Sequence, residues 1–131
     1  MIVRATRQEG YRFELRSGDR TLVSDQAQEA GGGGAGPMPG ELFLWAVASC
    51  FGQAMAHVAA RMRVPVEGLR VEVEGAKDER SFRFGTITVT VEGGCEAARL
   101  QRIADLARKI CFVTNSIAGT VEVLHRVRAR E

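Results

Sequence analysis

Residues 42–60 read LFLWAVASCFGQAMAHVAA, a run of nineteen residues without a charge. Its length is close to that of a membrane-spanning helix, but six alanines and several polar side chains make it weakly hydrophobic for such a span. Strands in which apolar and polar residues alternate flank it on both sides, as expected in a folded soluble domain. We therefore expect no membrane span but a central helix over 40–63, ending before Pro65 and fully buried in a core or an interface.

The composition indicates one soluble globular domain of 131 residues, 45% of them apolar and 26% charged. Eighteen Lys and Arg against sixteen Asp and Glu leave a net charge of +2, and the basic residues are scattered along the chain. Nucleic acid is therefore not an expected partner, because nucleic-acid binders concentrate basic residues on one face. The first ten residues contain no apolar stretch typical of a secretion signal, so we expect a cytoplasmic protein.

The hydrophobic period changes along the chain and predicts an α+β fold. Val71 and Val73, and later Ile87 and Val89, alternate with Glu or Thr as in half-buried strands. We expect antiparallel sheets packed on the long central helix and on a second helix. In chain order, the expected elements are an N-terminal hairpin or meander over 1–25, a flexible glycine-rich loop over 26–39, the central helix over 40–63, a strand pair over 69–92, the second helix over 96–111 and a C-terminal strand over 120–129.

Three widely spaced cysteines could carry chemistry or could simply pack in the core. Cys50 lies in the middle of the uncharged run and Cys111 at the end of the second helix, so only tertiary folding could bring them together. Free cysteine is among the most buried residue types, which by spacing alone favours core packing for both and for Cys95. Without a CxxC motif or paired histidines, we expect neither a disulfide framework nor a metal site.

Two segments around these cysteines resemble motifs of the OsmC/Ohr family, the osmotically inducible and organic hydroperoxide resistance proteins. Residues 36–51 read GPMPGELFLWAVASCF and resemble the segment before the family's first cysteine, while residues 111–117, CFVTNSI, resemble its second-cysteine motif. The element order, the glycine-rich loop and the chain length agree with this resemblance. The Pro-x-Glu-Leu pattern of residues 39–42 is similar to the broader OsmC-like branch.

The resemblance implies an intertwined homodimer with two active sites at the subunit interface. It also implies a thiol-dependent peroxidase that reduces organic hydroperoxides without a bound cofactor. Cys50 matches the peroxidatic position, where a thiolate becomes a sulfenic acid, and Cys111 the resolving position, where a second thiol closes a disulfide. An external dithiol would restore both thiols.

The resemblance further implies an arginine from the N-terminal hairpin that activates the thiolate and is held by a glutamate near the start of the central helix. Arg12, which follows Gly10-Tyr11, is the favoured candidate, and Glu41 is the candidate carboxylate. The hairpin carries three further candidates, Arg7, Arg16 and Arg20. Any of the four arginines could instead lie on a solvated face.

Glu41 departs from the family pattern, because peroxidases of the family carry the carboxylate ten residues before the first cysteine, where this chain has Gly40. Nine helical residues place Glu41 on the face opposite Cys50 and about 13 Å away along the axis. Glu41 would thus serve a site only across a dimer, and it could instead simply favour the helix dipole. A second departure is Phe112, where the family's motif commonly has Pro.

Other functional assignments are open at this point. His57 lies about 10 Å from Cys50 along the helix, so we expect it to pack in the core or an interface and not to act as a base, while His125 is expected to pack in its strand. The competing hypothesis for the whole chain is a dimer without peroxidase turnover that binds a small apolar or thiol-bearing ligand. A purely structural dimer is a third possibility. The surroundings of Cys50 discriminate among these hypotheses, because an enzyme needs a nearby cation and a bridging partner at Cys111.

Overall fold

The computed structural model describes residues 1–131 and divides into two compact units, Met1–Phe43 and Leu44–Glu131. Each unit contains one three-stranded sheet, and the helices complete the α+β fold expected from the sequence. The helix α1, Pro39–Met62, begins in the first unit and continues through the second.

The first unit opens with an antiparallel meander in the order β1-β2-β3. Its strands are β1 (Arg4–Glu9), β2 (Arg12–Ser17) and β3 (Arg20–Ser24). Gly10 and Gly18 lie in the two turns with φ of 49° and 62°, a backbone region that glycine adopts at little cost. The alternating residues of the N-terminal hairpin thus form a small sheet, and β1 is exposed along its whole length.

The glycine-rich loop that follows is held in place by Asp25, where the sequence suggested a flexible segment. Its carboxylate accepts hydrogen bonds from the backbone N–H groups of Gln26, Gly33 and Ala35. Burial alone would raise the pKa of Asp25, but these donors and the charge of Arg12 outweigh it and hold the pKa below its usual value of 3.8. The loop also contains a short 3₁₀ turn, η1, over Gln28–Ala30.

The bounds of helix α1 differ from the predicted ones by one residue at each end. The chain leaves the helix at Arg63, which has a φ of 55° and lies just before Val64 and Pro65. By length and composition it could cross a membrane, a test that a core helix also passes. One side of it packs into the core through six residues, which are Val47, Phe51, Ala54, Met55, Val58 and Ala59. The expectation of a fully buried helix is therefore wrong for the single chain, because Trp45 on another side is 53% exposed.

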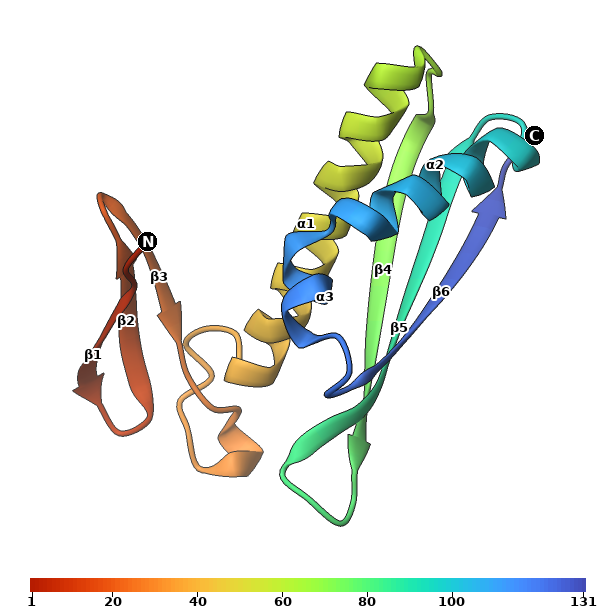
Figure 1. The fold of residues 1–131 in the computed structure, drawn as a ribbon. Coiled ribbons are helices and arrows are strands. Elements are labelled where there is room, and N and C mark those ends of the chain that lie inside the picture. The colour runs from red at the N-terminus through yellow and green to blue at the C-terminus, as the bar shows by residue number, and fades with distance from the viewer. The chain divides into compact units, whose positions relative to one another are not determined.

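The sheet of the second unit has the order β4-β5-β6. Its strands are β4 (Glu67–Asp78), β5 (Arg83–Gly94) and β6 (Glu122–Ala129), and the helices α2 (Ala97–Ile110) and α3 (Phe112–Ile117) lie between β5 and β6 in the chain. β4 pairs antiparallel with β5, but β6 pairs parallel with β5, where the sequence suggested antiparallel sheets. The parallel pairing follows from the helical connection, which returns the chain to the end of the sheet where β5 began (Figure 1).

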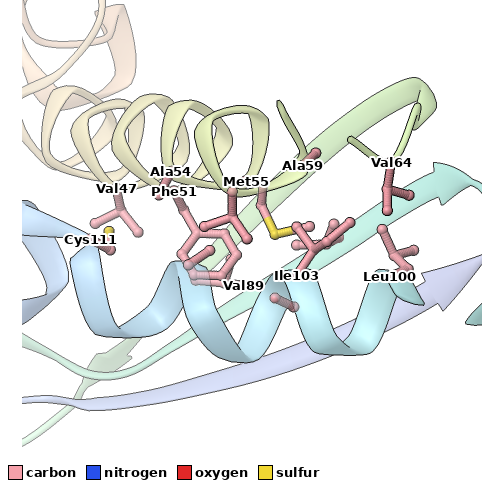
Figure 2. Close-up of a cluster of buried hydrophobic side chains, with 14 of the residues drawn as sticks. Val47, Phe51, Ala54, Met55, Ala59, Val64, Val89, Leu100, Ile103 and Cys111 are labelled. Carbon is pink, nitrogen blue, oxygen red and sulfur yellow. The ribbon is translucent and has the colours of Figure 1, made fainter. Parts of the chain in front are cut away.

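Helices α1 and α2 cover one face of this sheet and enclose the core (Figure 2). From β5, Ile87, Val89 and Val91 point into the cluster and are at most 1% exposed. The core side chains that α2 contributes are Leu100, Ile103, Ala104 and Ala107. Each large side chain buried here stabilises the fold by about 1.5–3 kcal/mol relative to an exposed position. Because both helices contribute side chains to the cluster, it fixes how α1 and the end of α2 meet.

Candidate active site: a pair of thiols

Cys50 and Cys111 lie side by side in the second unit, although sixty-one positions separate them in the sequence. Cys50 projects from the middle of α1, and Cys111 occupies the junction where α2 ends and α3 begins. The two thiols lie close enough that Cys50 raises the pKa of Cys111. Figure 2 shows Cys111 beside Val47, which precedes Cys50 by about one helical turn. Packing of α1 on the end of α2 thus brings the two candidate sulfurs together.

The two thiols differ in exposure. Cys50 is half-buried, whereas Cys111 is 0% exposed. Burial raises the pKa of the Cys111 thiol, the hydroxyl and the backbone N–H of Thr114 act in the opposite direction, and the neighbouring Cys50 raises the pKa further. Cys111 is therefore a protonated thiol at neutral pH, and Cys50 is the sulfur that a molecule from solution can approach.

Polar groups hold the turn that carries Cys111. The backbone N–H of Asn115 donates to the Cys111 carbonyl at 2.9 Å, and its side-chain amide donates to the Lys109 carbonyl at 3.1 Å. The Thr114 hydroxyl donates to the same Cys111 carbonyl at 3.3 Å. Phe112 is 74% exposed and takes no part in the core. These bonds fix the turn at a position where the family motif commonly uses the rigid proline ring.

Arg12 and Glu41 belong to the first unit, and each has a partner close in the sequence. The Arg12 guanidinium pairs with Glu9 at 3.3 Å, and its Nε atom is buried without a hydrogen-bond partner. Glu41 accepts a hydrogen bond from the backbone N–H of Met38 at 3.2 Å and so caps the start of α1. The two side chains do not pair with each other within the chain.

Two of the other three candidate arginines also have local contacts. Arg7 donates to the Gly10 carbonyl at 2.9 Å, and Arg16 pairs with Glu14 at 3.2 Å. Arg20 lies exposed at the start of β3. None of these contacts distinguishes one arginine as the cation for Cys50.

The family model described as OsmC-like protein matches residues 31–126, a segment that includes both thiols. The chain belongs to the OsmC family. Its curated relatives include the organic hydroperoxide resistance protein OhrB of Bacillus subtilis, 29% identical over 111 residues that cover 80% of this chain and 78% of the relative. Another is the organic hydroperoxide resistance protein of Xanthomonas axonopodis pv. citri, 29% identical over 117 residues that cover 79% of this chain and 82% of the relative.

Solved structures share the fold of this OsmC-family chain. An OsmC-like protein from Mycoplasma pneumoniae superposes with a TM-score of 0.89 at 16% identity and covers 99% of this chain and 96% of its own. OhrB of Bacillus subtilis superposes with a TM-score of 0.73 at 24% identity and covers 98% of each chain. The arrangement of strands and helices is therefore that of the family along nearly the whole chain.

Neither histidine of the OsmC-family chain is placed as a base for the thiols. The His125 ring packs on Phe51 with centroids 5.0 Å apart, and both of its nitrogens are buried without a partner. Burial, and next the charge of Arg108, lower the pKa of His125 to about 4, so the ring is neutral at pH 7. His57 is exposed on α1.

Cys95 lies apart from the thiol pair. Its thiol donates to the Glu96 carbonyl at 3.6 Å, and it lines a shallow pocket of about 290 Å³ with Val64 and Arg99 among others. Val64 and Cys111 mark opposite ends of the core cluster in Figure 2. No group of three or more His, Cys, Asp or Glu side chains is arranged to hold a metal ion.

Proposed function

We propose that the protein is a thiol-dependent peroxidase that reduces organic hydroperoxides. The observation that carries this proposal is the juxtaposition of a half-buried thiol, Cys50, with a fully buried one, Cys111, whose pKa it raises. A peroxidase of this kind needs one sulfur open to substrate and a second one beside it. The family membership and the two curated relatives named as organic hydroperoxide resistance proteins support the same chemistry.

The proposed cycle begins with the Cys50 thiolate. Its sulfur attacks one peroxide oxygen, an S–O bond forms, the O–O bond breaks, and the released alkoxide takes up a proton to become the alcohol. The Cys111 thiolate then attacks the Cys50 sulfur and displaces hydroxide, which leaves as water. The product is a Cys50–Cys111 disulfide. An external dithiol, the expected reductant in a reducing cytoplasm, returns two electrons and restores both thiols.

The surroundings of Cys50 favour an organic hydroperoxide over hydrogen peroxide. Cys50 is flanked on α1 by Phe51 and Ser49, and the apolar side chains of Val47 and Met55 lie about a turn on either side. An alkyl or aromatic substituent would gain from contact with apolar surface that hydrogen peroxide cannot use. Because Val47, Phe51 and Met55 are fully buried in the single chain, such a contact would need apolar surface supplied by the second subunit.

We propose that the active unit is an intertwined homodimer with its sites at the subunit interface. Helix α1 has no charged residue between Glu41 and Arg61, so the cation that activates Cys50 must come from another element. Arg12 is the proposed source, and Glu41 is proposed to hold the arginine across the dimer. A second copy would also cover large apolar side chains that the single chain exposes, Trp45 and Ile110 among them.

The proposal is tested by titrating the reduced protein with cumene hydroperoxide while free thiols are counted and disulfides are mapped by mass spectrometry. We expect the loss of two thiols per chain, a Cys50–Cys111 link, and no rapid reaction in Cys50→Ser. Cys111→Ser should stop at a Cys50 sulfenic acid that dimedone traps. Cys95→Ser is the matched control and should behave like the parent.

Slow oxidation at equal rates in the parent and in Cys50→Ser would refute the peroxidase. A dimer that retains the fold and binds a small apolar or thiol-bearing ligand would then become the better account. Sedimentation equilibrium on the same samples tests the dimer separately, because a monomeric mass at micromolar concentration would refute it whatever the thiols do.

A further inference from the structure

We propose that Thr114 is the positioning residue of the resolving cysteine: its hydroxyl donates to the Cys111 sulfur whenever that sulfur is an anion. This inference rests on the proposed peroxidase cycle and adds to it a residue that stabilises Cys111 both as the attacking thiolate and as the leaving thiolate. Thr114 follows Cys111 by three positions in the first turn of α3 and is 7% exposed.

The hydroxyl of Thr114 is available for this second bond. It donates to the Cys111 carbonyl at 3.3 Å, which is long for an O–H···O bond, whose usual length is about 2.7–2.8 Å. The carbonyl does not depend on it, because the backbone N–H of Asn115 donates to the same oxygen at 2.9 Å. Rotation about the C–O bond of Thr114 can therefore transfer the hydroxyl hydrogen from the carbonyl to the sulfur without leaving a buried acceptor unpaired.

The Cys111 sulfur needs such a donor because no water reaches it. Cys111 is 0% exposed and belongs to the apolar core cluster. An unpaired anion in such surroundings is strongly disfavoured. Among the neighbours of the thiol, burial and Cys50 oppose ionisation, whereas the hydroxyl and the backbone N–H of Thr114 favour it. The thiolate that the resolving step requires thus depends on one residue.

The same bond would assist the reduction of the disulfide. An external dithiol reaches the half-buried Cys50 and not the fully buried Cys111. The dithiol sulfur forms a bond to the Cys50 sulfur, the Cys50–Cys111 bond breaks, and the electron pair leaves on Cys111 as a thiolate. Because a stabilised thiolate leaves faster, Thr114 would act in this step as well as in disulfide closure.

The first test measures the ionisation of Cys111 without any peroxide. In a chain carrying Cys50→Ser and Cys95→Ser, the ultraviolet absorbance of the thiolate is followed against pH for Thr114→Val, Thr114→Ala, Thr114→Ser and Asn115→Ala. Val keeps the shape of Thr but lacks the hydroxyl, and Ala lacks the hydroxyl without adding a methyl group. Ser keeps the hydroxyl. Asn115→Ala loosens the turn and leaves Thr114 in place. We expect Val and Ala to reduce the thiolate fraction about tenfold at a given pH, while Ser and Asn115→Ala match the parent.

The second test follows disulfide closure with Cys50 present, using dimedone to trap the sulfenic acid. A tenfold smaller thiolate fraction is partly offset by the higher nucleophilicity of a more basic thiolate, so Thr114→Val should close the disulfide about three- to fourfold more slowly. Formation of the sulfenic acid should be unchanged, and Thr114→Ser should restore the parent rate.

Two results would overturn the inference. One is an unchanged Cys111 ionisation in both Thr114→Val and Thr114→Ala. The other is a change of Cys111 ionisation in Asn115→Ala as large as that in Thr114→Val, which would assign the effect to the shape of the turn. Failure of the proposed peroxidase has a different signature, since the parent would then form neither sulfenic acid nor disulfide while the ionisation test could still succeed.

Discussion

His125 should make the stability of the protein fall between pH 7 and pH 5, and His125→Phe should remove this dependence. The folded pKa of about 4 lies below the value of 6.5 for an unperturbed histidine. The stabilisation is therefore complete above pH 6.5 and is lost as the pH falls toward 4, because the unfolded chain takes up a proton that the folded chain cannot. Asp25 contributes little in this window, since its pKa lies below its usual value of 3.8.

The folded and unfolded pKa values of His125 set the size of this loss of stability. At pH 5 the difference in proton uptake corresponds to about 2 kcal/mol of unfolding free energy. Because the side chain of His125 is only half-buried as a whole, solvent screening reduces this to about 1 kcal/mol. Both of its nitrogens lack partners, so a phenyl ring that packs on Phe51 should cost little at pH 7.

Urea unfolding at one protein concentration, with the thiols kept reduced, measures the effect at pH 7 and pH 5. The parent should lose about 1 kcal/mol more than His125→Phe between the two pH values. His57→Gln is the matched control, because it alters an exposed histidine of α1 and keeps His125. Equal losses in the parent and in His125→Phe would refute the assignment of the pH dependence to this ring.

Three other substitutions and one fluorescence measurement probe the core, the loop, the turn and the proposed dimer. Met55→Ala should cost about 2–5 kcal/mol of unfolding free energy in urea, because Met55 is fully buried. Asp25→Ala should expose the glycine-rich loop to limited proteolysis within residues 26–36, since three backbone N–H groups lose their acceptor. Phe112→Ala should change stability by less than about 0.5 kcal/mol, because the ring is exposed. Trp45, the single tryptophan, should emit as a buried indole in the proposed dimer, and dilution to monomer should shift its emission to the red.

The sequence predicts the helices of this fold better than its strand pairing. The end of α1 follows from Pro65, because the residue before a proline is pushed out of the helical region. The alternation of β6 predicts a strand, but a period of two is the same for parallel and antiparallel neighbours. The order strand, helix, strand over β5, α2 and β6 was the available signal for the parallel pairing.

The features of the candidate site also differ in how far the sequence predicts them. The proximity of Cys50 and Cys111 could be predicted only through the family resemblance, because neither spacing nor period carries information across sixty-one residues. The role of Asp25 escaped prediction because its carboxylate binds backbone groups up to ten residues away. The relation of Thr114 to the thiol could not be predicted, because it depends on how tightly the turn closes around Cys111.

The position of Cys50 at the border of the packed side of α1 explains how one helix can serve both the core and the chemistry. Phe51 and Val47 lie on the packed side and fix the helix against the sheet and α2. Cys50, one position before Phe51 and so about 100° around the axis, is kept half-buried by the same packing. Its sulfur therefore lies beside Cys111 at the edge of the core. A rotation of α1 large enough to bury Cys50 would unpack Phe51, so the stability of the core itself maintains the accessibility of the thiol.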